Sequence, residues 1–119
     1  MREIAIAAVV MLALDSVYLS LTRGFWGNVV KSVQNSPLVL KYLPAALVYA
    51  LLTIGLSYFI LQRGAKVDEA FLYGVVVYGV YELTNRAILD RWPMTAVLID
   101  TLWGGVAMAA TTYIVKRIV

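Results

Sequence analysis

Four long apolar stretches in a chain of 119 residues most strongly limit the structures that it can adopt. They run over residues 4–21, 42–61, 70–88 and 94–115, with short polar segments between them. Each is close to the roughly 20 residues that an α-helix needs to cross about 30 Å of hydrocarbon. We therefore expect an all-α fold, an integral membrane bundle of four transmembrane helices that forms a single domain over residues 1–119.

The composition supports a chain surrounded by lipid. Hydrophobic residues make up 62% of the sequence and charged residues only 14%, against about 25% charged residues in a soluble domain. The basic residues are scattered at the ends of the apolar segments, which predicts headgroup contacts and no binding of nucleic acid. The chain has no Cys and no His. Disulfides, thiolate chemistry, His-ligated haem and ordinary zinc sites are therefore excluded, and we expect no cofactor and no metal.

The topology follows only in part from the sequence. The first apolar stretch resembles a signal peptide, but it lacks a convincing cleavage site, so we interpret it as an uncleaved first span. The connection over residues 28–41 is mildly amphipathic, which favours a position along the membrane surface. Four crossings place both termini on one side, and the two sides carry equal numbers of basic residues: Arg2, Arg63, Lys66, Lys116 and Arg117 against Arg23, Lys31, Lys41, Arg86 and Arg91.

This equality leaves two topologies open. If Arg86 lies inside the membrane and does not count, the positive-inside rule places the termini in the cytoplasm. A true balance would instead permit dual topology, in which antiparallel copies could pair.

Polar groups within the apolar stretches are the main indication of function. Ionisable residues inside a membrane are costly and commonly mark a functional site. We predict an intramembrane polar site on spans one, three and four that contains Asp15, Tyr18, Tyr78, Tyr81, Glu82, Thr84, Asn85, Arg86, Asp100 and Trp103.

Three of these residues are acids that we expect at one depth. With a rise of about 1.5 Å per residue, Asp15 and Glu82 lie about 17 and 18 Å from the side of the termini, and Asp100 about 21 Å. Arg86 follows Glu82 at i,i+4, so the two side chains can pair within one helix. Three acids and one Arg leave an excess of negative charge, which requires protonation or a bound cation. The second span has no charge and is expected to be more peripheral.

A short pattern is shared by the first and last spans. Residues 11–19, MLALDSVYL, and residues 96–104, AVLIDTLWG, both place an Asp and a Ser or Thr before an aromatic residue. Because the two helices run antiparallel, the pattern is compatible with internal pseudo-symmetry. Coincidence is the alternative interpretation.

The arrangement of these motifs resembles a known family. Asp15 followed by VYL, YELTN at 81–85, WP at 92–93 and IDTLWG at 99–104 are similar to a family of small four-span predicted membrane proteins catalogued as a domain of unknown function. Glu82 stands where that family usually has Asp, and Tyr18 where it often has Trp. The resemblance marks Asp15, Tyr81, Glu82, Thr84, Asn85, Trp92, Pro93, Asp100, Trp103 and Gly104, and it implies no established activity.

Two functions remain open. In the first, a small transporter or channel uses Asp15, Glu82 and Asp100 as a site for protons, cations or small solutes. In the second, the chain is a structural or accessory membrane subunit whose polar layer only fixes helix packing, in contact with lipid and with a homo-oligomer or another membrane protein. A membrane enzyme has less support, because the chain lacks His, Cys and a nucleophile motif. We therefore expect no catalytic residues.

Overall fold

A computed structural model describes residues 2–119, which form helices joined by short turns and one extended segment. The helices are α1 (Arg2–Leu21), α2 (Arg23–Gln34), α3 (Tyr42–Leu56), the π-helical turn η1 (Ser57–Leu61) that continues α3, α4 (Val67–Ile88) and α5 (Met94–Ile118). The prediction of an all-helical fold is confirmed for the described residues.

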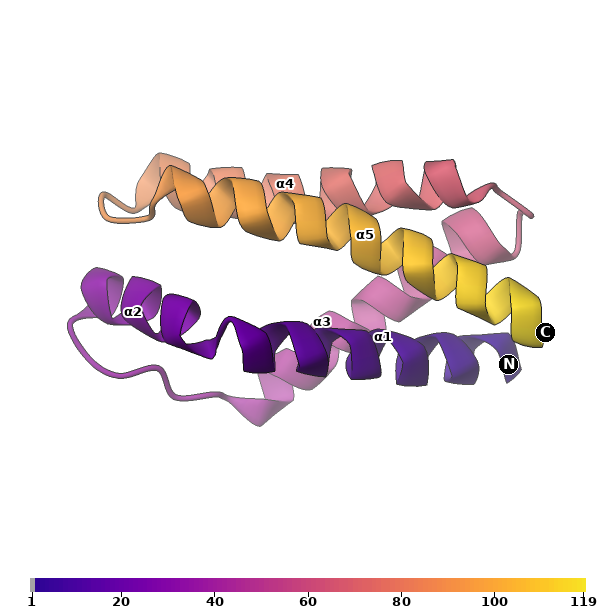
Figure 1. Ribbon diagram of the computed structural model, residues 1–119, viewed down its shortest axis with the longest axis horizontal. Helices are drawn as coiled ribbons and strands as arrows, with labels where there is room; N and C mark the ends of the chain where they lie inside the picture. The colour runs from indigo at the N-terminus through magenta and orange to yellow at the C-terminus, as the bar shows by residue number, and fades with distance from the viewer. Residues whose placement is uncertain (1) are drawn as a thin grey trace.

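Four long helices lie roughly along one axis in an elongated body of 44 × 24 × 22 Å (Figure 1). α4 and α5 form an antiparallel pair, and α1 packs against α5. α3 crosses obliquely beneath this group and packs mainly against α1. The two ends of the chain lie at the same end of the body, as four alternating helices require.

The helix ends agree with the sequence prediction to within a few residues, and the difference at α4 has a clear cause. The backbone N–H of Lys66 donates a hydrogen bond of 2.9 Å to Oε1 of Glu69. Glu69 and Asp68 also place negative charge in the first turn, where it is stabilised by the helix dipole. This arrangement lets α4 begin at Val67, three residues before the predicted start.

The connection after α1 is more ordered than predicted. Instead of one surface segment over residues 28–41, the structure has a separate helix, α2, followed by an extended stretch. Asn35 ends α2 with φ 58°, in the left-handed conformation that commonly terminates helices. α2 is amphipathic: Val29 is buried against Trp92 and Val97, while most of the opposite face is exposed.

Two apolar clusters hold the helices together. The larger one lies towards the termini and includes Met11 of α1, Leu56 of α3, and Met108 of α5. The smaller one lies at the other end, where Val29 of α2 meets Trp92 and the first turn of α5. The three acids predicted to form a site line a cavity together with residues of both clusters.

Close backbone contact joins α4 to α5. Gly74 lies directly against the backbone of Gly104 and Gly105, so that a side chain at position 74 would overlap it. The ring of Tyr78 covers Gly104 in the same way. Small residues at such contacts let two helices approach closely, which is a common way to pack helices in membranes.

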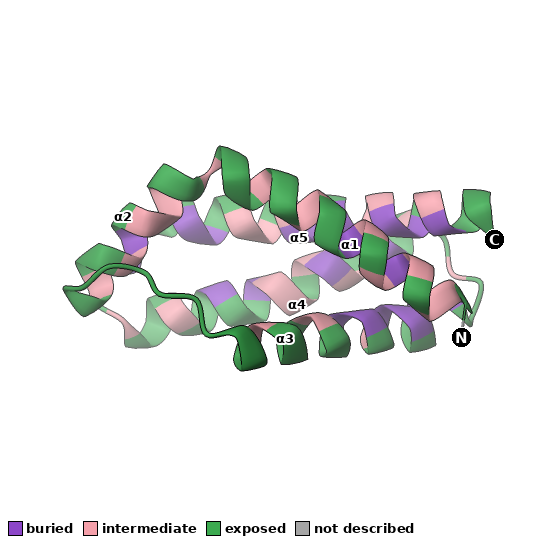
Figure 2. Cartoon of the chain, turned by 90° about the horizontal axis from the view of Figure 1, so that it is seen from below, coloured by how far each residue is buried: buried purple, intermediate pink, exposed green. Residues whose placement is uncertain are grey.

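The outer surface is strongly apolar, as lipid contact requires. Figure 2 shows exposed residues along the outward faces of α1 and α3; among them Val9, Leu43 and Leu51 are 67%, 72% and 69% exposed. Three helices are long and apolar enough to cross a membrane: α1, α3 continued by η1, and α5. α4 has sufficient length, but its acidic first turn and the polar stretch 81–86 make it less apolar. Its crossing therefore stays a prediction.

The glycine contact yields a stability prediction. We expect Gly74→Ala to lower the free energy of unfolding by about 1–3 kcal/mol, because the added methyl group forces α4 away from α5. Gly27→Ala is the matched control: position 27 is helical and has open space around it, so the change should stabilise the protein by up to about 1 kcal/mol. Unfolding in mixed detergent micelles, followed by circular dichroism, measures both. Equal stability of the two variants would contradict the close contact.

Candidate functional site

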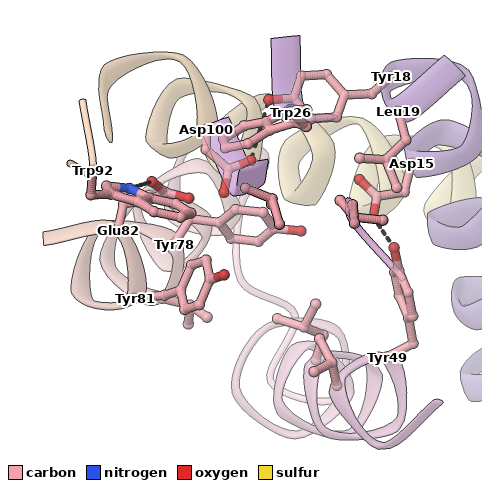
Figure 3. A pocket seen from close by; sticks show the side chains of 15 residues that line it. Asp15, Tyr18, Leu19, Trp26, Tyr49, Tyr78, Tyr81, Glu82, Trp92 and Asp100 are labelled. Carbon is pink, nitrogen blue, oxygen red and sulfur yellow. Dashed lines mark hydrogen bonds between the residues drawn. The ribbon is translucent and has the colours of Figure 1, made fainter. Parts of the chain in front are cut away.

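A cavity of about 460 Å³ lies between the two apolar clusters and is formed by all five α-helices together with the segment that links α2 to α3 (Figure 3). Its lining residues are Asp15, Tyr18, Leu19, Trp26, Val30, Leu38, Val48, Tyr49, Leu52, Val77, Tyr78, Tyr81, Glu82, Trp92 and Asp100. The three acids predicted to share one depth thus line one cavity. None of its 15 described lining residues is Lys or Arg.

Asp15 on α1 is held by two neutral donors. The hydroxyl of Tyr49 on α3 donates to Oδ2, and the indole Nε1 of Trp103 on α5 donates to Oδ1 at 2.8 Å. Hydrogen bonds to an ionised carboxylate are stronger than those between neutral groups. Both oxygens of Asp15 therefore have a partner, and the side chain links three helices.

The first and last helices exchange these contacts reciprocally. Trp103 of α5 donates to Asp15 of α1, and Tyr18 of α1 donates to Oδ1 of Asp100 at 3.3 Å. The rings of Tyr18 and Trp103 stack between the two acids, with centroids 4.6 Å apart and an interplanar angle of 2°. The repeated Asp-x-x-aromatic pattern thus corresponds to a two-fold-like pairing of antiparallel helices.

Glu82 on α4 has a different environment. Its side chain is fully buried, and Oε1 accepts a 2.8 Å hydrogen bond from Nε1 of Trp92. Oε2 is buried without a hydrogen-bond partner in the described structure. Asp100 lines the same cavity as Glu82, and the two acids interact electrostatically. An unpartnered carboxylate beside a second acid is costly to bury unless a proton or a cation compensates it.

The predicted pair between Glu82 and Arg86 is wrong. Arg86 is exposed, and its guanidinium donates a 3.0 Å hydrogen bond to the backbone carbonyl of Trp92. It thereby fastens the turn after α4, which positions the indole of Trp92 against Glu82. The positive charge that sequence reasoning assigned to the site therefore lies outside the cavity.

Three other predicted residues, Thr84, Asn85 and Trp103, also lie outside the cavity lining, although Trp103 contacts the lining residue Asp15. Thr84 is exposed, because it lies on the opposite side of α4 from Glu82. Asn85 is half-buried, and its backbone carbonyl accepts from the N–H of Leu89 at the end of α4.

Sequence reasoning missed Tyr49, Trp26 and the contact of Trp92 with Glu82. α3 is mostly exposed, as expected of a peripheral span, yet Tyr49 reaches from it to Asp15. A hydroxyl within an apolar span was the available signal, since such groups seek partners away from lipid. Trp26 lies on α2, and the centroid of its ring is 6.2 Å from that of the ring of Trp92. Nothing in the sequence indicates that α2 folds back over the cavity.

The cavity combines negative charge with aromatic walls. Three carboxyl groups share it with four tyrosines and two tryptophans, and the remaining lining residues are aliphatic. Within residues 2–119 no three acidic side chains come together at a spacing suited to a metal ion. Carboxylates attract positive charge, and the faces of aromatic rings attract it further. The arrangement is therefore suited to a singly charged cation or a proton.

The contact of Trp92 with Glu82 can be tested by a double-mutant cycle. Trp92→Phe should lower the free energy of unfolding by about 1–3 kcal/mol, because Glu82 loses its only described hydrogen bond while it stays buried. In a Glu82→Leu background the same change should cost distinctly less. Equal costs in both backgrounds, measured by unfolding in mixed micelles, would show that Trp92 acts through packing alone.

Comparison with known proteins places the chain in a family. The model of the family described as "Predicted membrane protein (DUF2177)" matches residues 1–116. No curated protein and no solved structure matches the chain. The match spans nearly the whole chain, and it agrees with the apolar helices and with the resemblance to a family of unknown function. The chain therefore belongs to the DUF2177 family of predicted membrane proteins.

Proposed function

We propose that this membrane protein is a small carrier that holds a proton or a cation in its carboxylate-lined cavity and moves it across the bilayer. The observation that carries the proposal is the environment of Glu82. Its side chain is fully buried, and one of its carboxyl oxygens has no hydrogen-bond partner in the described structure. Asp100 lines the same cavity, and no Lys or Arg is among the described lining residues. A proton shared by the two acids, or a cation between them, removes the free-energy cost of this burial.

The proposal includes a fourth crossing by α4. Its 22 residues span about 33 Å, enough for the hydrocarbon layer. α4 packs along α5 and turns Glu82 inwards. Arg86 lies two residues before the end of α4, where its long side chain can extend to the headgroups. The charges that make α4 less apolar thus lie inside the bundle or near its ends.

Exchange follows from the charge balance of the acid pair. When one positive charge enters the cavity, one proton leaves Glu82 or Asp100, so that the net charge inside the bundle is unchanged. Asp15 stays held by its hydrogen bonds from Tyr49 and Trp103 and takes no part in this exchange. Alternate opening of the cavity to the two sides would then move protons and cations in opposite directions.

The proposal predicts flux that depends on Glu82. In liposomes containing the purified chain and an internal pH dye, an imposed gradient of Na⁺, K⁺ or benzyltrimethylammonium should drive proton movement in the opposite direction. Glu82→Gln and Asp100→Asn should reduce the rate to that of protein-free liposomes. Asp68→Asn, which changes an exposed acid at the start of α4, should keep the original rate.

Two results would refute the carrier function. One is an absence of proton movement with all three cations in the unaltered protein. The other is a Glu82→Gln variant that transports as well as the Asp68→Asn control.

A structural role is the second candidate, and the reciprocal contacts of α1 and α5 favour it. Tyr18 donates to Asp100, Trp103 donates to Asp15 and the two rings stack, so that neutral donors on each helix hold the acid of the other. Such hydrogen bonds stabilise helix pairs in membranes by about 0.6–2 kcal/mol each. In this alternative the acid layer only sets the register of the bundle, and lipid or a partner protein covers its outer face.

Stability across pH separates the two candidates. For a carrier, the folded state holds a proton that the unfolded chain releases, so the free energy of unfolding should rise as the pH falls. Glu82→Gln should flatten this pH dependence and lower the free energy of unfolding only slightly at neutral pH. Asp15→Asn should lower the free energy of unfolding by about 1–3 kcal/mol, because the amide replaces one acceptor oxygen with a donor. If both variants lose stability equally at every pH, the acids serve packing alone.

A further inference from the structure

We propose that the cavity takes an amphiphilic organic cation with one positive charge, such as an ammonium group attached to an apolar body, and that this ligand enters from the lipid between α3 and α4. The inference rests on the proposed cation site and adds the class of ligand and its route.

The charge of the ligand follows from the number of acids that remain free. Asp15 has a partner on each oxygen, so it has little capacity for a further ligand. Glu82 and Asp100 line the same cavity, and Oε2 of Glu82 has no partner in the described structure, so that the proposed site would hold one proton between these two acids. A ligand that replaces one shared proton carries one positive charge.

Aromatic rings surround the place where that charge would lie. Figure 3 shows the indole of Trp92 against the carboxyl group of Glu82, the ring of Tyr78 extending into the middle of the cavity, Tyr81 on the same helix, and Tyr18 and Trp26 near Asp100. An alkylated ammonium cannot donate several hydrogen bonds, but it binds well against the faces of aromatic rings. A small inorganic cation would instead require a shell of oxygen atoms.

The remaining walls suit the apolar part of such a ligand. Aliphatic side chains from five different segments also line the cavity: Leu19, Val30, Leu38, Val48, Leu52 and Val77. The volume of about 460 Å³ is within the range of sites for small organic molecules. A proton or a hydrated metal ion would leave most of this apolar volume unused.

Exposed lining residues on α3 and α4 indicate a route from the lipid. Near the termini the two helices are joined by a hydrogen bond of 3.4 Å from Tyr73 to the carbonyl of Leu52. Beyond it the backbone of α3 runs obliquely away from that of α4 (Figure 1). Val48 of α3 and Tyr81 of α4 both line the cavity, and they are 52% and 56% exposed. In a bilayer these side chains would face lipid.

Binding measurements can test the class of ligand. We would titrate the full chain in phosphatidylcholine nanodiscs with benzyltrimethylammonium and with its neutral isostere neopentylbenzene, following tryptophan fluorescence against protein-free nanodiscs. Trp26 and Trp92 line the cavity, so occupation should change their emission. The cation should bind at least about tenfold more tightly than the neutral compound. Glu82→Gln should remove this preference.

Aromatic variants provide the matched control. Tyr81→Leu should weaken binding of the cation about tenfold, while Tyr81→Phe, which keeps the ring, should bind as the unaltered chain does. Tyr113→Leu removes a similarly exposed tyrosine of α5 that lies outside this cavity and should have no effect. Elution volume and helical content confirm that each variant is folded. Equal binding by Tyr81→Leu and Tyr113→Leu would overturn the aromatic recognition.

The titrations also separate this inference from the proposed function. If Na⁺ or a change of pH alters the emission in a manner that depends on Glu82, but benzyltrimethylammonium does not, the cation site stands and the organic ligand is wrong. If no cation and no change of pH gives an effect that depends on Glu82, the cation site itself is refuted.

A pair of adjacent substitutions tests the route. Val48→Trp should obstruct the proposed route between α3 and α4 and slow association of benzyltrimethylammonium severalfold. Leu47→Trp adds the same side chain at a neighbouring exposed position that does not line the cavity, and should leave the association rate unchanged. Stopped-flow fluorescence measures both rates. Association at the same rate in the two variants would show that the ligand does not enter between α3 and α4.

Discussion

The burial of carboxyl groups among apolar helices is the constraint on which the structure depends. A charged or polar group without a partner is expensive in an apolar environment, so Asp15, Glu82 and Asp100 have to face one another or suitable donors. Indole and hydroxyl groups supply most of these donors. The positions of α1, α3, α4 and α5 around the cavity follow from this requirement as much as from the two apolar clusters.

The acids of the cavity differ in their hydrogen-bond partners, and this difference connects the packing to the proposed function. Asp15 accepts a hydrogen bond on each of its carboxyl oxygens and joins three helices. Glu82, in contrast, has one buried carboxyl oxygen without a hydrogen-bond partner in the described structure. In the proposed carrier, the first arrangement would stay in place while the second would take up a proton or a cation. The two candidate functions therefore concern different acids of the same cavity.

Prediction from the sequence succeeded where a single helix carries the information. The apolar stretches predicted the long helices, and the three acids that were expected at one depth line one cavity. Prediction failed where the helical spacing allowed a side chain more than one partner. Spacing allowed Arg86 to pair with Glu82, but the guanidinium reaches the carbonyl of Trp92 instead. The separate helix α2, its fold over the cavity and the reach of Tyr49 were likewise not foreseen.

The sequence by itself determined that the chain is helical, that it belongs in lipid and that polar groups must gather inside it, because hydrophobicity and helical rise are local properties. Only the tertiary structure decided which acid is satisfied and which is not. That outcome depends on the contact of Gly74 with Gly104, on the oblique path of α3 and on the turn that brings Trp92 to Glu82. These contacts join residues far apart in the chain, and the distances between their atoms are set only when the helices pack.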